Sequence, residues 1–159
     1  MSKTGRIPIA LSLVSILFVS NSCPAAQKPG PHGGKVLKAG KAVIEFTVDK
    51  DEHPHIFRLN DKGETIAMDG MKVALKALTP KKAMNISLSR TTEGLGAEAD
   101  EVEHLAGGIP MPEPDEYPAE ISIKLGKLSK KFRFQYMAGF CAECGLPAFS
   151  CTCTVAKGD

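Results

Sequence analysis

The stretch AVIEFTVDKDEHPHIFRL, residues 42–59, decides the fold that the sequence predicts. Every second residue in its first half is apolar: Ala42, Ile44, Phe46 and Val48. Glu45 and Thr47 occupy the alternate positions and would point to the opposite side. A period of two is that of a half-buried β-strand. The polar run Asp49–Glu52 then predicts a turn before the next strand.

The same alternation continues later in this stretch and beyond it. It recurs at His55-Phe57-Leu59, Val73-Leu75-Ala77, Ile86-Leu88, Ile121-Ile123-Leu125 and Phe132-Phe134-Tyr136, with turn-forming residues between these runs. Seven or eight short strands at this spacing predict an all-β fold, an antiparallel immunoglobulin-like β-sandwich over residues 35–137. The pattern predicts that five large side chains are buried: Phe46, Phe57, Leu75, Ile123 and Phe134.

One segment interrupts this pattern. Residues 91–123 contain nine acidic side chains and no Lys or Arg, together with Gly107, Gly108 and several prolines. This composition predicts a long, non-regular, solvated acidic loop.

Residues 1–22 have the order of a secretory signal peptide. Lys3 and Arg6 are followed by the apolar run IPIALSLVSILFV, residues 7–19, and then by small and polar residues. This run is shorter than the stretch of roughly 20 residues that a transmembrane helix needs. We therefore expect an exported protein of the bacterial periplasm or cell envelope.

Cys23 follows this segment in a setting that resembles a bacterial lipobox, because Ser22 is the small residue before the cysteine. Ser20 departs from that motif, which prefers Leu at this position. Lipidation of Cys23 would make the protein an anchored lipoprotein, touching the membrane only through its lipid. Plain cleavage near Ser22 or Ala25 is the alternative. Residues 23–34, rich in Pro, Gly and Ala, then predict a flexible tether.

The composition of the mature chain argues against nucleic acid as a partner. Removing residues 1–22 leaves residues 23–159, which is enough for one domain. The whole chain has 20 Lys and Arg, and the removal of Lys3 and Arg6 leaves 18 of them against 18 Asp and Glu. This charge balance, the absence of Trp and the scarcity of aromatic side chains give no reason to expect nucleic acid.

The strongest chemical signal lies in a cysteine-rich tail, residues 138–159. Four of the five cysteines fall between positions 141 and 153: Cys141, Cys144, Cys151 and Cys153. A C-x2-C turn followed by Gly145 resembles a zinc knuckle, and glycine allows the positive-φ bend that such a turn needs. In an extended C-x-C pair both sulfurs lie on one face. Four converging thiolates would suit Zn²⁺, and Cu⁺ as a second choice.

Two disulfides are the alternative for this tail, because an exported chain meets an oxidising environment. Other metal-ligand types are scattered along the chain. His32 is a candidate ligand because it lies in the tether, whereas His53, His55, Met68 and Met71 are better explained as turn, edge or core residues.

The motif Pro31-His32-Gly33-Gly34, followed by a short strand and then AVIEFTVDKDE, resembles the N-terminal β-domain associated with periplasmic adaptor proteins of heavy-metal efflux pumps. The resemblance covers roughly residues 31–136 in pattern, and only the four-residue motif is specific. It implies a periplasmic sandwich working near copper, zinc or related ions, with His32 as the one residue carried over. The chain lacks the long helical hairpin of the adaptors and adds the cysteine tail.

No catalytic motif is found in the sequence, so we do not expect an enzyme. The sequence predicts an accessory protein of the cell envelope that carries or buffers Zn²⁺ or Cu⁺. Its expected partners are the metal ion and an envelope metal-transport protein, with a link to heavy-metal efflux. The alternative is a structural or interaction module whose cysteines form disulfides or a structural zinc brace.

Overall fold

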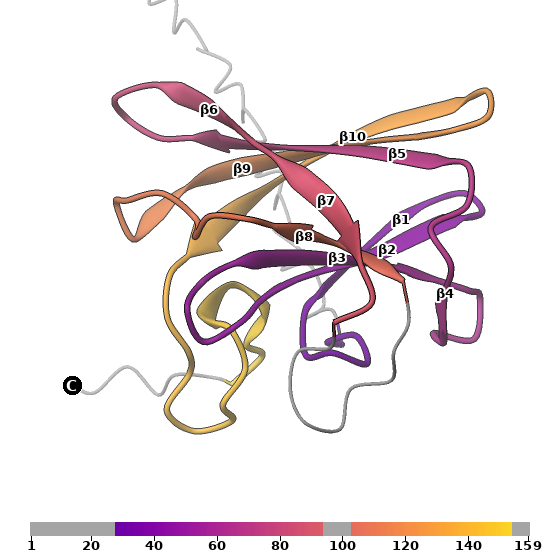
Figure 1. The fold of residues 1–159 in the computed structure, drawn as a ribbon. Helices are drawn as coiled ribbons and strands as arrows, with labels where there is room; N and C mark the ends of the chain where they lie inside the picture. Colours follow the sequence, from indigo (N-terminus) through magenta and orange to yellow (C-terminus); the bar gives the residue numbers. More distant parts are fainter. Residues whose placement is uncertain (1–27, 94–102, 154–159) are drawn as a thin grey trace, which may run out of the picture.

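A computed structural model describes residues 28–93 and 103–153 of the chain. The predicted signal peptide and Cys23 lie outside these residues. The described part is an antiparallel β-sandwich of two sheets (Figure 1). The first sheet contains β1 (Lys35–Ala39), β2 (Ala42–Val48), β3 (Pro54–Leu59), β4 (Thr65–Ile66), β7 (Leu88–Thr91) and β8 (His104–Gly107). The second contains β5 (Met71–Leu78), β6 (Ala83–Ile86), β9 (Glu116–Leu125) and β10 (Leu128–Met137).

The strand order is β1-β2-β3-β8-β7 in the first sheet and β10-β9-β5-β6 in the second. Strands β4 and β8 pair with the two ends of the same strand, β3: Leu59 is opposite Thr65 and His55 is opposite Ala106. Only Ser87 separates β6 from β7, so the chain passes directly from one sheet to the other. The all-β sandwich is confirmed, whereas its immunoglobulin-like class remains a prediction.

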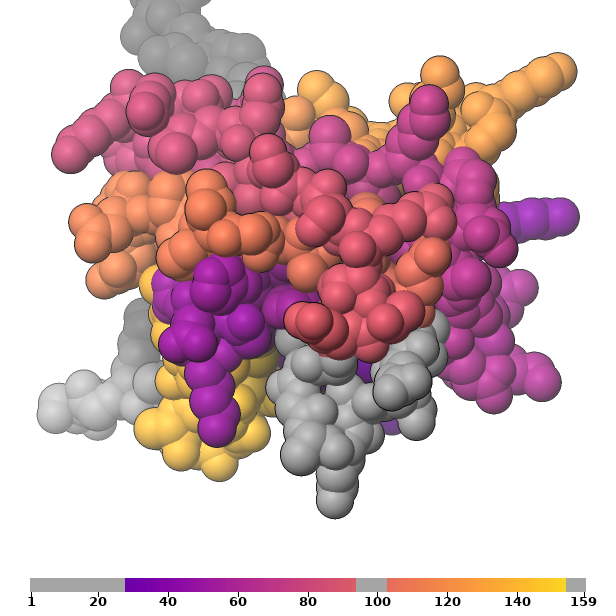
Figure 2. Space-filling view, viewed as in Figure 1, coloured from indigo at the N-terminus to yellow at the C-terminus, as the bar shows by residue number. Residues whose placement is uncertain are grey.

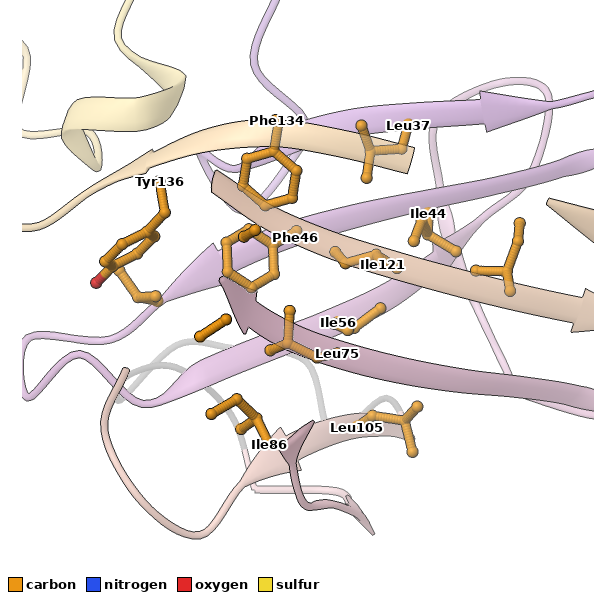
Figure 3. Close-up of a cluster of buried hydrophobic side chains, with 14 of the residues drawn as sticks. Leu37, Ile44, Phe46, Ile56, Leu75, Ile86, Leu105, Ile121, Phe134 and Tyr136 are labelled. Atoms are coloured by element: carbon orange, nitrogen blue, oxygen red, sulfur yellow. The ribbon is translucent and has the colours of Figure 1, made fainter. Parts of the chain in front are cut away.

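The core lies between the sheets and follows the predicted alternation. Figure 3 shows Phe46 between Phe134 and Leu75, with Ile44, Ile56 and Ile121 next to them. The five side chains predicted to be buried are all at most 8 % exposed. Phe57 nevertheless belongs to a second, smaller cluster with Val36, Val43 and Leu59. This second cluster lies on the other side of β2 and β3, so β2 is buried on both faces.

The acidic segment is more regular than expected. It contains β8, and β9 begins at Glu116, so the segment contributes a strand to each sheet. His104 is 1 % exposed and Met111 is 5 % exposed. The prediction of one non-regular loop over 91–123 is wrong for these parts, because side chains of β8 and alternate side chains of β9 are buried. Residues 94–102 lie outside the described part.

The described part of the predicted tether is held against the sandwich. The backbone N–H groups of His32 and Gly34 donate to Oε1 of Glu45, at 2.9 and 2.7 Å. A Cβ atom on Gly34 would overlap the carbonyl of Phe46, so only glycine fits there. Residues 28–34 therefore differ from the flexible tether predicted for 23–34, and the PHGG motif closes over the Glu45 carboxylate.

Within the described residues, no helix is long and apolar enough to span a bilayer. The single helical turn there is η1 (Ala148–Ser150), in the cysteine-rich segment.

Candidate metal centre

Residues 141–153, here called the cysteine loop, begin with a tight turn. The N–H of Gly145 donates to the carbonyl of Cys141 at 2.9 Å, and the N–H of Cys141 donates to the carbonyl of Leu146 at 2.8 Å. Gly145 has φ +69°, a value that favours glycine. The C-x2-C-G pattern therefore forms the bend that the sequence predicts, with Cys141 and Cys144 on one turn.

The chain then returns through η1 to the second pair of cysteines. The N–H of Cys151 donates to the carbonyl of Pro147 at 3.1 Å, which closes the helical turn. The N–H of Cys153 lies 3.3 Å from Sγ of Cys151. This return places the C-x-C pair beside the turn that carries the C-x2-C pair.

The four cysteines form one cluster. Their Sγ atoms all lie within 4.8 Å of one another, and Sγ of Cys144 is 3.6 Å from Sγ of Cys151. All four are free thiols in this structure. In a tetrahedral site with Zn–S bonds of about 2.3 Å, two sulfurs are about 3.8 Å apart. The cluster therefore needs only small shifts to enclose one ion.

The four thiols do not have the same pKa. The backbone N–H of Cys144, the thiol of Cys151 and the N–H of Glu143 donate to the sulfur of Cys141 and lower its pKa to about 7. Hydrogen bonding with Cys144, and then with Cys151, raises the pKa of Cys153. The thiolate form is thus favoured at Cys141, whereas the protonated form is favoured at Cys151 and Cys153. A bound cation would remove this restriction because it stabilises all four thiolates.

The cluster is accessible to solvent. Cys144 is exposed, and the other three cysteines are partly exposed. A small chelator can therefore approach the sulfurs directly, which matters for any exchange of a bound ion.

The cysteine loop is fastened to the sandwich by its middle. Phe149 is 6 % exposed and packs among Phe46, Phe134 and Tyr136, with ring centroids 5.1, 6.2 and 5.5 Å away. The hydroxyl of Ser150 donates to the carbonyl of Gly33 at 2.7 Å. The segment that the sequence analysis placed outside the sandwich, residues 138–159, thus contributes a core residue in its described part.

The structure does not bring His32 into the cysteine cluster. The His32 ring stacks on Phe57, with centroids 3.8 Å apart, and its Nε2 lies 2.8 Å from the Thr65 hydroxyl. Among the described residues, only the four cysteines form a group of three or more metal-ligand side chains at this close spacing. The contact between the PHGG motif and the Ser150 hydroxyl is made by the backbone of Gly33.

The remaining candidates lie elsewhere. Met68 and Met71 are buried core residues, as expected. His53 and His55 lie 3.3 and 3.5 Å from Oδ2 of Asp49, and His55 also contacts His104 at 3.1 Å. Burial lowers the pKa of His55 more than Asp49 raises it.

The burial of two important residues is not apparent from the sequence pattern. Glu45 is fully buried, and burial raises its pKa despite the N–H groups of Gly34 and His32. Its place in a strand marked it as solvent-facing. Phe149 lies within the cysteine pattern, two residues after Pro147, where no strand period predicts a core residue.

No family model, curated protein or solved structure matches this chain. The candidate metal centre therefore rests on the geometry of the cysteine loop.

Proposed function

We propose that this protein is a metal-binding accessory protein of the bacterial cell envelope that holds one exchangeable soft ion in the cysteine loop. The observation that carries this proposal is the convergence of four free sulfurs within 4.8 Å. Such a set of four thiolates is a ligand shell for Zn²⁺ or Cu⁺. Hard cations such as Mg²⁺ and Ca²⁺ prefer oxygen ligands.

Carriage or buffering is supported by the exposure of the site. Because Cys144 is exposed, an incoming ligand can reach the ion and replace one sulfur at a time. The cell envelope is supported by the signal-like sequence at positions 1–22, and a link to heavy-metal efflux by the PHGG resemblance. An envelope metal-transport protein is the corresponding partner, and lipidation of Cys23 would hold the protein near it.

A structural brace is a second candidate, favoured by a specific contact. Phe149 lies between the two cysteine pairs and is buried in the core. An ion that joined the pairs would hold this phenylalanine in place. Four-cysteine zinc sites of this closed kind are commonly structural.

The test is metal binding combined with exchange. Protein reconstituted with Zn²⁺ or Cu⁺ should bind one equivalent, and Cys144→Ser should lose most of the affinity. Cys23→Ser is the matched control, because it removes one thiol at a position far from the cysteine loop in sequence. A carrier gives up its ion to a chelator within minutes while near-UV circular dichroism keeps its folded signature. A brace releases the ion only as that signature is lost.

Two results would contradict the proposal altogether. The first is protein purified from the envelope with no bound metal and no thiol open to alkylation, which indicates two disulfides. The second is equal metal binding by Cys144→Ser and by Cys23→Ser, which would place the ion outside the cysteine loop.

A further inference from the structure

The second sheet and its turns carry a strong excess of basic side chains. The hairpins β5–β6 and β9–β10, residues 71–86 and 116–137, carry nine basic side chains and two acidic ones, Glu116 and Glu120. The basic residues are Lys72, Lys76, Lys81, Lys82, Lys124, Lys127, Lys130, Lys131 and Arg133. Basic and acidic side chains are nearly balanced over the whole chain, so this one sheet concentrates half of the positive charge that follows the signal-like segment.

Strand register places several of these cations on the outer side of the sheet. Met71, Leu75 and Ile123 point into the core, so the alternate residues Lys72, Lys76 and Lys124 point outward. Lys131 and Arg133 alternate in the same way with the core residue Phe134. We call these five outward cations the basic face.

Two cations on the basic face are direct cross-strand partners. Lys72 of β5 is paired with Lys124 of β9. Like charges directly opposite each other destabilise a sheet. Glu120 lies opposite both Lys76 and Arg133 and forms an ion pair of 3.0 Å with Lys131. Glu120 is thus the one acidic neighbour of three cations and forms an ion pair with Lys131. The Lys72–Lys124 pair has no acidic residue opposite it on these strands.

Basic residues also lie in the turns at the two ends of the sheet. In Figure 1 the β10-β9-β5-β6 sheet forms the upper layer, with the β5–β6 turn at one end and the β9–β10 turn at the other. Lys81 and Lys82 belong to the first turn and Lys127 to the second. Figure 2 shows these hairpins projecting at the two upper corners of the molecule.

We propose that the basic face docks on a membrane surface of anionic phospholipids. Eight of the nine cations are lysines, and lysine is depleted from protein–protein interfaces, whose centres are apolar and aromatic. The large exposed apolar residues of the described part are Ile109, Met137 and Phe140, and only Met137 belongs to this sheet, at its end. A broad lysine array without an apolar centre fits a layer of anionic headgroups.

Nucleic acid fits the basic face less well. A protein that binds single strands offers exposed aromatic side chains for base stacking, and the tyrosine and phenylalanine rings of β9 and β10 point into the core or lie partly buried. The contact proposed here is additional to a lipid at Cys23 and does not depend on the metal site.

Docking in this way would orient the cysteine loop. In Figure 1 the yellow cysteine loop lies at the bottom and the β10-β9-β5-β6 sheet at the top. A membrane on the basic face therefore leaves the four sulfurs on the side away from the bilayer, where a soluble donor or acceptor can reach them.

The test compares two triple variants of the full chain that have the same net charge. Lys72→Gln/Lys124→Gln/Arg133→Gln neutralises the basic face, and Lys38→Gln/Lys41→Gln/Lys62→Gln is the matched control on exposed residues of the other sheet and its turns. Partitioning is measured by sedimentation with vesicles of phosphatidylcholine, with and without one third phosphatidylglycerol. The ratio of the two partition coefficients reports the electrostatic part and cancels any contribution of the apolar N-terminus.

Each Lys or Arg close to an anionic surface contributes about fivefold to binding. The basic-face variant should therefore lower the ratio by on the order of 100-fold, whereas the control should change it by less than about fivefold. Raising the salt from 0.05 to 0.5 M should abolish the preference for anionic vesicles, because exposed charges are screened. Circular dichroism melting of both variants verifies that they are folded.

Three results would overturn the proposal. One is an equal fall of the partition ratio in the two variants, which would show that binding depends on net charge and not on the basic face. Another is no preference of the parent protein for anionic vesicles at 0.05 M salt. The third is binding to duplex DNA that is tighter than binding to the vesicles and is lost in the same variant, which would assign the face to nucleic acid.

Discussion

The ring of Phe149 lies 5.1 Å from the ring of Phe46, so a residue from the cysteine loop packs against the centre of the sandwich core. Phe46 is completely buried in β2, the strand that is covered on both faces. The contact couples the candidate metal centre to the stability of the whole domain. A substitution in the cysteine loop should therefore alter the stability of the domain, and a substitution in the core should alter the candidate metal centre.

Phe149→Ala should destabilise the protein by about 3–5 kcal/mol, the usual cost of removing a buried phenylalanine. Urea unfolding gives the measurement, and Phe140→Ala is the control because Phe140 is 41 % exposed. The control should cost less than about 1 kcal/mol, in keeping with substitutions at the surface. Equal losses in the two variants would mean that Phe149 is not a core residue.

Zinc should stabilise the folded chain. At free Zn²⁺ 100-fold above the dissociation constant, the free energy of unfolding should rise by about 2.7 kcal/mol, less whatever the unfolded thiols retain. Thermal melting with and without zinc measures the gain. The double variant Cys144→Ser/Cys151→Ser should show none, since Sγ of Cys144 and Sγ of Cys151 are neighbours at 3.6 Å. A gain retained in that variant would place the ion elsewhere.

His32→Phe should leave zinc stoichiometry and affinity unchanged. The new ring can still stack on Phe57, but it has no ring nitrogen to bind an ion or the Thr65 hydroxyl. The lost hydrogen bond should cost about 1 kcal/mol of stability. Competition with a chromophoric chelator measures the affinity. Weaker zinc binding in His32→Phe would restore His32 as a ligand.

Gly34→Ala should be poorly tolerated, because the added methyl group would overlap the carbonyl of Phe46. Overpacking of this kind typically costs about 1–3 kcal/mol, and more where backbone must move. Gly108→Ala is the comparison, since a Cβ atom on Gly108 meets no atom within 4 Å. Equal melting temperatures of the two variants would contradict the close approach of the PHGG motif to β2.

Stability should fall with rising pH through the titration of Glu45. Burial raises the pKa of Glu45 above its ordinary value of 4.5 in the folded state. Between pH 4.5 and that raised value, the folded protein binds more protons than the unfolded chain, so the free energy of unfolding decreases as pH increases. Glu45→Gln has no such titration.

Urea unfolding of the parent protein and Glu45→Gln at pH 4.5 and pH 8 measures this effect. The parent should lose stability relative to Glu45→Gln as the pH rises, and the titration of Asp49 and His55 cancels in the comparison. A difference that stays constant between the two pH values would show that Glu45 is not perturbed.

The fold could be predicted from local patterns because each strand carries its own period of two. Ile44, Phe46, Ile121 and Phe134 alternate with polar residues in the sequence and are buried between the sheets. The cysteine cluster could also be predicted, since its four ligands come from one short stretch and depend on a local turn at Gly145. Local geometry is enough to bring such residues together.

Other features depended on contacts between residues far apart in sequence. Glu45 alternates with apolar residues as a solvent-facing residue of a strand would. Only its contacts with the backbone N–H groups of His32 and Gly34 show that its carboxylate is buried. Phe57 is buried as the pattern predicts, but it lies on the side of β3 opposite the main core, under His32. An alternating pattern separates two faces of a strand without saying what covers each face.

By itself, the sequence determined the two-residue period of the strands, the turns between them and the convergence of four sulfurs, because each depends on neighbouring residues. Only the tertiary structure decided that Phe149 enters the core, that the PHGG motif closes over Glu45 and that Lys72 lies opposite Lys124 in the second sheet. Each of these relationships joins segments that are well separated along the chain. Strand pairing and sheet packing decide which of these segments meet, and a local sequence pattern does not specify either.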